Sequence, residues 1–261
     1  MKGYFRVLRS DKTGLARWAA ELQARGIPAN FNIGTKMLSE GGEILALMGR
    51  IAGLGFEMGG SCDKPFWGMS RSEQYDAIKR MKDGIEDLTG RPMLLFSSKY
   101  SAYTEDTLAI ADELGIPYLF GRGVTGESAA VFRPKEYSVR IISTSDVSIG
   151  GVPGTLADGS FWSRGASPEE LKNVLLSLRA ERITFAVQSQ LSGVKVRWRD
   201  AVRSFLDSGR VEWKGIQAFC EASETRPFSE IPVNDTVDYL EPLPLIPLEK
   251  EEDITEEEPA I

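Results

Sequence analysis

Short runs of strand type alternate with amphipathic stretches along most of the chain. In the first amphipathic stretch, Leu15, Trp18 and Leu22 recur at helical spacing and mark one apolar face. Repeated β–α units of this kind form a parallel sheet, because each helix returns the chain to the edge where the previous strand began. The runs that we interpret as strands are 3–10, 27–34, 55–61, 92–97, 116–121 and 182–190.

Some helix boundaries carry clear signals, and other stretches are less regular. Ser70 and Glu73 form a capping box ahead of one helix, and Ser167 begins another. A single buried helix is predicted over residues 35–55, and residues 130–149 are expected to be extended.

The glycine-rich stretch 150–165 ends in the aromatic pair Phe161–Trp162 and is predicted to be a loop. One interpretation is a lid in which Trp162 stacks on a ligand or closes a pocket. The alternative is a surface loop that one buried tryptophan anchors.

The number of β–α units, about seven, predicts a distorted (β/α) barrel over residues 1–240. The active face of such a barrel lies at the carboxyl ends of its strands. Residues 241–261 combine spaced prolines with many acids, so we expect an extended or disordered tail.

Composition excludes several kinds of catalytic site. The chain has no histidine, which excludes serine–histidine triads, HExxH zinc sites and cysteine–histidine pairs. Its two cysteines, Cys62 and Cys220, form neither a disulfide framework nor a CxxC motif. Asp11, Cys62 and Asp63 could form a zinc site, but Lys64 would place a positive charge beside the metal. We therefore expect no metal and no other cofactor.

Charge and hydropathy limit the possible partners. The net charge is −7, of which residues 249–258 carry −6, so the remainder is nearly neutral and no nucleic-acid surface is expected. No run approaches the ~20 apolar residues of a membrane helix, and the first residues lack the features of a signal peptide. We expect a cytoplasmic protein without a membrane partner; the sequence does not predict its oligomeric state.

Residues 55–118 resemble the polysaccharide deacetylase family, also called the NodB homology domain or carbohydrate esterase family 4. The matching pieces are GFEMGGSCDKP, YDAIKRMKDGIEDLTGRP, LFSSKYSAY and TLAIADELGIPYLF. Upstream, IPANFNIG is similar to a family strand, and FAVQSQLSG with RWRDAVRSFL resembles the branch of peptidoglycan deacetylase and metal-independent allantoinase. The likeness covers most of residues 1–222 and implies the same barrel.

Every motif that carries the family's catalysis has departed from its pattern, and at best one carboxylate of the paired aspartates survives. Family enzymes hold a divalent metal through one aspartate and two histidines, with a second aspartate as base and a late histidine as acid. The paired aspartates align with Ser10 and Asp11, and the late histidine aligns with Gln188. The metal histidines map to Ser61 and Lys64, and an arginine–proline–proline turn becomes Ser97, Ser98 and Lys99.

Two functions remain open on the sequence alone. In the first, the barrel mouth binds a saccharide or small polar ligand after loss of the metal chemistry, and the ligand-binding residues are Trp67, Lys99, Tyr100, Tyr103 and Trp162. In the second, the chain is a metal-independent hydrolase of C–N amide bonds, with Asp11 as base and Lys64 or Lys99 stabilising the oxyanion. Asp11, Lys64 and Gln188 are the candidate catalytic residues, and a closed pocket joining Asp11 to a lysine would favour the second function.

Overall fold

The structure is a computed structural model and describes residues 1–8, 11–121, 126–222 and 225–227. Its strands are β1 (Lys2–Leu8), β2 (Ala29–Gly34), β3 (Glu57–Cys62), β4 (Leu95–Ser98), β5 (Tyr118–Gly121), β6 (Val131–Arg133), β7 (Arg140–Ser143), β8 (Asp146–Ile149), β9 (Val152–Thr155), β10 (Arg182–Gln188), β11 (Glu212–Trp213) and β12 (Thr225–Pro227). The main sheet has the order β10-β1-β2-β3-β4-β5-β7-β6-β12, with β11 paired to β1. The pairs from β10 to β7 are parallel, and β6 is antiparallel to β7.

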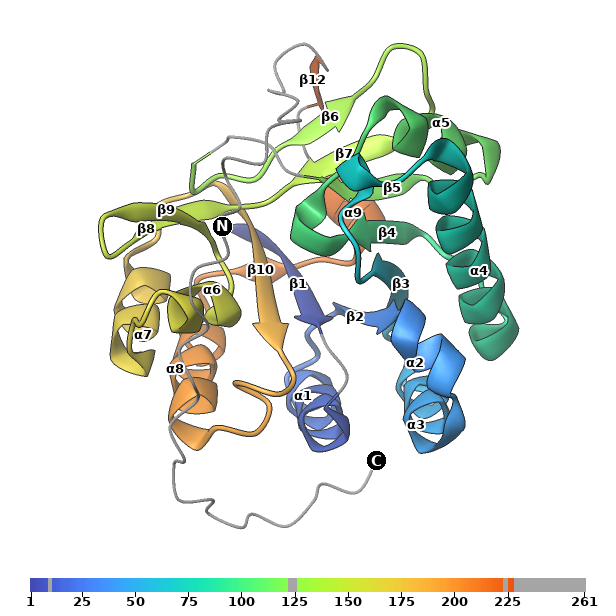
Figure 1. Ribbon diagram of the computed structural model, residues 1–261. Coiled ribbons are helices and arrows are strands. Elements are labelled where there is room, and N and C mark those ends of the chain that lie inside the picture. The colour runs from blue at the N-terminus through green and yellow to red at the C-terminus, as the bar shows by residue number, and fades with distance from the viewer. Residues whose placement is uncertain (9–10, 122–125, 223–224, 228–261) are drawn as a thin grey trace.

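Most helices lie on the outside of this curled sheet, whereas the short helix Ile216–Glu221 packs against its inner face (Figure 1). The helices are α1 (Lys12–Ala24), α2 (Thr35–Glu40), α3 (Gly42–Gly53), α4 (Arg71–Thr89), α5 (Glu105–Glu113), α6 (Asp158–Ser163), α7 (Pro168–Ser177), α8 (Val196–Asp207) and α9 (Ile216–Glu221), with short 3₁₀ turns η1 (Phe66–Gly68) and η2 (Lys99–Ser101). The predicted distorted (β/α) barrel is therefore confirmed, although its sheet also includes the antiparallel pair β6–β7.

Two apolar layers follow from the alternation of side chains along each strand. On β1, Phe5 and Val7 belong to the large cluster that packs the helices against the sheet. Tyr4, on the opposite face, belongs to a second cluster inside the barrel with residues such as Phe120 and Ile142. The next inward residue of β1 is Arg6, so the interior of the barrel also holds a charged group.

Side-chain hydrogen bonds join β10 to the end of β7, where the sheet has no ladder. Thr184 of β10 donates from Oγ1 to the Ser143 carbonyl at 3.2 Å. The Ser145 amide donates to Thr184 Oγ1 at 2.8 Å, and the Thr184 amide donates to Ser145 Oγ at 3.1 Å. These contacts bring the two sides of the curled sheet together and enclose the interior.

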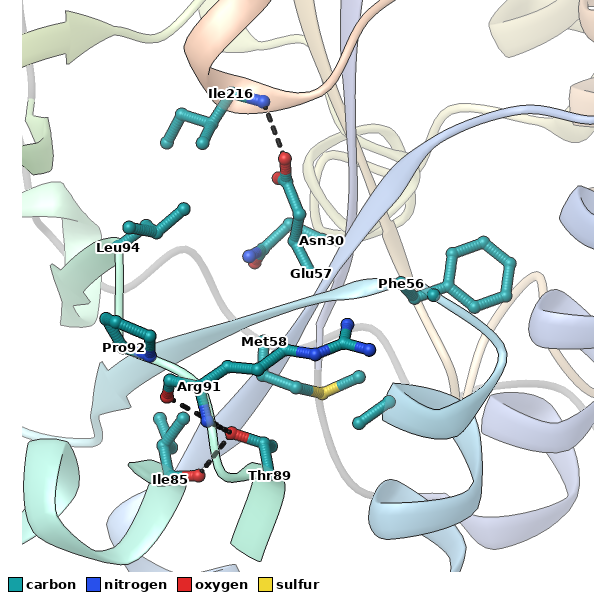
Figure 2. Close-up of a pocket in the computed structure, with 12 residues that line it drawn as sticks. Asn30, Phe56, Glu57, Met58, Ile85, Thr89, Arg91, Pro92, Leu94 and Ile216 are labelled. Atoms are coloured by element: carbon teal, nitrogen blue, oxygen red, sulfur yellow. Dashed lines mark hydrogen bonds between the residues drawn. The ribbon is translucent and has the colours of Figure 1, made fainter. Parts of the chain in front are cut away.

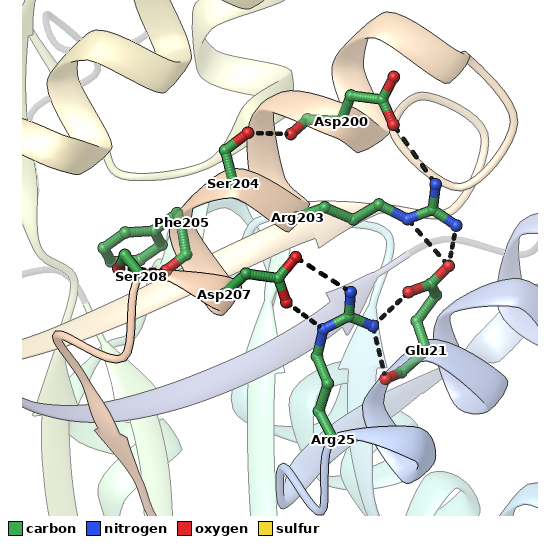
Figure 3. Close-up of polar contacts among 8 residues, drawn as sticks. All are labelled: Glu21, Arg25, Asp200, Arg203, Ser204, Phe205, Asp207 and Ser208. Carbon is green, nitrogen blue, oxygen red and sulfur yellow. Dashed lines mark hydrogen bonds and ion pairs between the residues drawn. The ribbon is translucent and has the colours of Figure 1, made fainter.

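An ion-pair network ties α1 to α8 on the outer surface (Figure 3). Glu21 of α1 accepts hydrogen bonds from Arg203 of α8 and from Arg25, and Arg25 Nε donates to Asp207 Oδ1 at 2.8 Å. Burial alone would raise the pKa of Glu21, but the hydrogen bonds from Arg203 and Arg25 outweigh it and lower the pKa. The network fixes the two helices whose first turns flank the loop after β10.

The capping signals are correct. Ser70 Oγ accepts from the Glu73 amide, and Glu73 Oε2 accepts from the Ser70 amide at 2.8 Å. The helix beginning at Pro168 has the same reciprocal pair between Ser167 and Glu170.

Two local predictions are wrong. Residues 35–55 form α2 and α3 rather than one helix, because Gly41 and Gly42 adopt φ values of 63° and 70° and turn the chain. The stretch 150–165 is not a loop throughout: β8 and β9 form a hairpin, and α6 follows. Phe161 is 1% exposed and belongs to the core.

Some predictions concern residues outside those that the structure describes. These are the tail 241–261 and the first residue of the aligned aspartate pair, Ser10. Across the described ranges, the helices are all too short or too polar to span a membrane.

Candidate functional site

The carboxyl ends of the parallel strands meet at one end of the barrel, here called the mouth. The register pairs Leu8 with Gln188, Gly34 with Ser61, and Cys62 with Ser98. The candidates Asp11, Lys64, Lys99 and Gln188 therefore all lie at the mouth, at the last residue of a strand or within three residues after it.

Asp11 is held by the helix that it begins. Its Oδ1 accepts a hydrogen bond from the Gly14 amide at 2.8 Å, and its own amide donates to Ser189 Oγ at 3.0 Å. This is the geometry of an N-cap, in which the carboxylate satisfies a free amide of the first turn. Within the described part of the chain, Asp11 forms no ion pair with Lys64 or Lys99. The closed carboxylate–lysine pair that would favour a hydrolase is not formed.

The residues of the mouth do not fit the family's divalent metal. Asp11, Ser61 and Lys64 stand at its ligand positions, and an ammonium cannot be a metal ligand. Burial raises the pKa of the Cys62 thiol, which is 4% exposed, and so disfavours the thiolate that binds metals. Asp63 accepts from Thr35 Oγ1 at 3.0 Å. The described residues include no group of three His, Cys, Asp or Glu side chains that could hold an ion.

Two aromatic side chains form an open pair at the mouth. Trp67 and Tyr100 stack with an interplanar angle of 3° and ring centroids 6.1 Å apart. Lys99 Nζ lies 4.9 Å from the centroid of the Tyr100 ring, in the range of a cation–π contact. Tyr100 is 41% exposed, an unusual degree for a large apolar side chain in this structure. We call Trp67, Tyr100 and Lys99 the aromatic platform.

Local backbone conformation presents the aromatic platform to solvent. In η1, Phe66 is fully buried and stacks on Phe96 at 5.3 Å, while its neighbour Trp67 is half-buried. Tyr100 has φ of +63°, in the left-handed region that non-glycine residues rarely adopt. Such strained positions occur where the surrounding structure enforces them, often at binding sites.

The other predicted aromatic residues are not part of the aromatic platform. Tyr103 is 8% exposed, and a Cβ on Gly121 would lie 2.8 Å from its ring, so Tyr103 packs tightly over β5. Trp162 is half-buried and packs against the helix-side core.

Asp158, which sequence reasoning missed, organises the mouth around Gln188. It is fully buried at the start of α6, and its Oδ1 accepts from the amides of Gly159 at 2.6 Å and Gln188 at 2.9 Å. Its Oδ2 accepts from the hydroxyl of Ser192. Burial raises the pKa of Asp158 to about 7 against the opposing effect of these hydrogen bonds. In the sequence it stood in the stretch predicted to be a loop, where nothing marked it as buried.

Gln188 is in turn fixed by its neighbours. A Cβ on Gly159 would lie 2.0 Å from Gln188 Nε2, so the amide side chain packs directly over that glycine. Gln188 Oε1 accepts a hydrogen bond from Gln190 Nε2 at 2.9 Å.

A buried arginine lies in the interior beneath the mouth. Arg6 is 4% exposed; its Nη2 donates to Ser97 Oγ at 3.0 Å, and its guanidinium lies 3.8 Å from the centroid of Phe120. Burial lowers the pKa of Arg6 to about 10, so it remains a cation at neutral pH. Among the residues described, Arg6 Nε and Asn32 Oδ1 have no hydrogen-bond partner. Polar groups with spare hydrogen-bonding capacity therefore underlie the mouth.

Comparison with solved structures identifies the architecture. A protein from Mycobacterium smegmatis assigned to the polysaccharide deacetylases matches with a TM-score of 0.64 and 14% identity, over 80% of this chain and 76% of that one. The chain has the fold of the polysaccharide deacetylases. A peptidoglycan N-acetylglucosamine deacetylase matches with a TM-score of 0.61 and 14% identity, over 86% of this chain and 90% of the other.

A pseudoenzyme also has this fold. A mutant of a CE4 family pseudoenzyme from Bacillus anthracis matches with a TM-score of 0.59 and 12% identity, over 86% of this chain and 68% of that one. No protein-family model matches the chain. A search of curated proteins likewise found no match. At these identities the comparisons establish the fold alone, and function must be argued from the site.

Proposed function

We propose that the mouth of this polysaccharide-deacetylase-like barrel binds a saccharide or a small polar ligand, without the metal-dependent deacetylation of its structural relatives. The observation that carries the proposal is the parallel pair of the half-buried Trp67 and the exposed Tyr100 beside Lys99. The faces of a pyranose ring present C–H groups that pack on aromatic rings, while its hydroxyls need polar partners at the ring edge. Lys99 and Gln188 supply such partners at the mouth.

The same residues argue against the family's chemistry. Deacetylation in the family needs a metal-activated water, whose pKa falls towards ~7 only beside the cation. The side chains at the ligand positions do not form that site, and the Asp11 carboxylate is occupied by the Gly14 amide. A single lysine would have to replace both the activated nucleophile and the oxyanion partner.

We predict that replacing Trp67 by alanine weakens binding of N-acetylglucosamine oligomers about tenfold, because it removes one of the two rings of the aromatic platform. Isothermal titration calorimetry on the unaltered and substituted proteins measures this. Trp162→Phe is the matched control and should leave affinity unchanged, since Trp162 packs on the core. Weaker binding in the control with unchanged binding in Trp67→Ala would assign the ligand to α6 instead and reject the proposal.

We also predict no acetate release from the same oligomers, with or without added zinc or cobalt. Loss of one preorganised oxyanion donor alone lowers the rate about 10²–10³-fold. The residues at the mouth would have to supply both the oxyanion donor and the activated water without the family's metal site. Release above background that disappears in Asp11→Asn would instead establish the metal-independent amide hydrolase.

A further inference from the structure

A pocket of about 280 Å³ lies at the opposite end of the barrel from the mouth. It is bounded by the first residues of β2 and β3, the end of α4 with the loop that follows it, and the first residue of α9 (Figure 2). Its volume is at the lower end of the range for small-molecule sites, so an occupant would be small. The proposal made for the mouth does not involve this pocket.

One wall of the pocket carries the carboxylate of Glu57, which has no cationic partner among the described residues. Glu57 Oε2 accepts from the Tyr4 hydroxyl at 3.1 Å, and Glu57 Oε1 accepts from the Ile216 amide at 2.8 Å. Within the described ranges, Glu57 forms no ion pair with a lysine or arginine. Burial raises the pKa of Glu57 although both hydrogen bonds oppose the shift. A cation placed beside it would offset the cost of burying the charged form.

Beside Glu57 lies the buried side-chain amide of Asn30, whose oxygen is an unused hydrogen-bond acceptor among the described residues. Asn30 is 1% exposed, and its Oδ1 has no hydrogen-bond partner among the described residues. The strand register places Asn30 directly opposite Glu57, and Figure 2 shows the two polar ends together on the same side of the pocket. Rotation of the amide exchanges its oxygen and nitrogen within the same volume. Glu57 and Asn30 together therefore offer acceptors to a hydrogen-bond donor.

The remaining walls are mostly apolar. Phe56, Met58 and Ile85 border the pocket but belong to the helix-side cluster, on the other face of β3 from Glu57. On the face of Glu57, the apolar wall consists of Ile216 and Leu94, which belong to or pack against the inner cluster. Arg91 extends along Met58 at the rim (Figure 2); it is exposed and forms no ion pair within the part of the chain that the structure describes. The pocket thus has a half-buried carboxylate, an apolar wall beside it and one cation near the surface.

We propose that this pocket binds a small primary ammonium compound with an apolar body, the ammonium donating to Glu57 and Asn30 and the body lying against Leu94 and Ile216. A free amine and an apolar α-amino acid share this chemistry. They differ in the carboxylate, which only the amino acid would offer to Arg91.

The test is a calorimetric titration of the full chain with 2-phenylethylamine and with its neutral analogue 2-phenylethanol. The amine should bind about tenfold more tightly or better, because a hydrogen bond to a charged group exceeds one between neutral groups. Glu57→Gln should abolish this preference, whereas Glu181→Gln should not, since Glu181 is an exposed glutamate, 79% accessible, just before β10. Equal affinity for amine and alcohol, or no binding of the amine, would overturn the proposal.

A second variant and a comparison with phenylalanine complete the test. If Glu57→Gln does not fold by circular dichroism, Leu94→Trp fills the pocket on the face of Glu57 without changing that carboxylate and should abolish amine binding. Unchanged binding in Leu94→Trp would place the amine elsewhere and refute the proposal. Phenylalanine binding that weakens in Arg91→Gln, with amine binding unchanged, identifies an amino acid as the natural class; tighter binding of the amine than of phenylalanine identifies a free amine.

Discussion

Replacing Gly14 by alanine should lower the free energy of unfolding by about 3 kcal/mol. A Cβ on Gly14 would lie 1.9 Å from the carbonyl oxygen of Ser189 and 2.6 Å from its carbonyl carbon. These are backbone atoms, so no side-chain rotation relieves the overlap. A Cβ on Gly193 would lie 2.2 Å from the same carbonyl oxygen of Ser189. The two glycines allow the first turn of α1 to touch the loop after β10, and chemical denaturation measures the loss.

Gly49→Ala is the matched control for this prediction. Gly49 lies within α3, and its added Cβ would meet a Leu88 methyl at 3.5 Å, an ordinary contact. Because alanine favours a helix interior over glycine, the free energy of unfolding should rise by up to about 1 kcal/mol. Equal effects of the two substitutions would contradict the close packing at the mouth.

Replacing Asp158 by asparagine should change how stability depends on pH. The pKa of the buried Asp158 is about 7, whereas its ordinary value is 3.8. The folded state therefore binds more protons than the unfolded state between these values, and the free energy of unfolding falls as pH rises through that window. The contribution is complete below about pH 4 and is lost by about pH 7.

The comparison of the native protein with Asp158→Asn isolates this group. The stability of the native protein relative to the variant should decrease with rising pH, by up to about 1.4 kcal/mol for each unit between pH 4 and 7. Urea denaturation across that range measures the difference. A difference that does not vary with pH would show that Asp158 keeps an ordinary pKa in the fold.

The variant should also loosen the mouth. An asparagine has one acceptor oxygen, while the Asp158 carboxylate accepts from Gly159 and Gln188 on one oxygen and from Ser192 on the other. One of these groups must lose its acceptor, so we expect this loss to add about 2 kcal/mol of destabilisation that does not vary with pH to the pH-dependent difference.

The sequence predicted the barrel because its main determinants are local. Short runs of strand type, helical spacing and capping boxes such as Ser70–Glu73 are visible in short windows and agree with one another. The hairpin of β8 and β9 was equally readable: Gly150 and Gly151 adopt φ values of 59° and 83°, as a tight hairpin turn requires. We interpreted the glycines there as loop formers instead.

The site was less predictable because it depends on contacts between distant segments. Sequence reasoning selected Trp67, Tyr100 and Lys99, but their stacking depends on the left-handed conformation of Tyr100. The burial of Arg6 follows from the inward face of β1, which a parallel strand does not reveal by alternation. As an acceptor, Asp158 joins residues that are 30 and 34 positions away in the sequence.

The most direct test of the proposed function is the indole region of a ¹H–¹⁵N correlation spectrum during titration with an N-acetylglucosamine oligomer. The chain has five tryptophans, and Trp18, Trp162, Trp198 and Trp213 all pack in or against the core, so they serve as internal controls. We expect the Trp67 indole signal to shift and saturate while the other signals stay in place. A Trp67 signal that remains fixed while another indole shifts, or no shift at any oligomer concentration, would contradict ligand binding at the mouth.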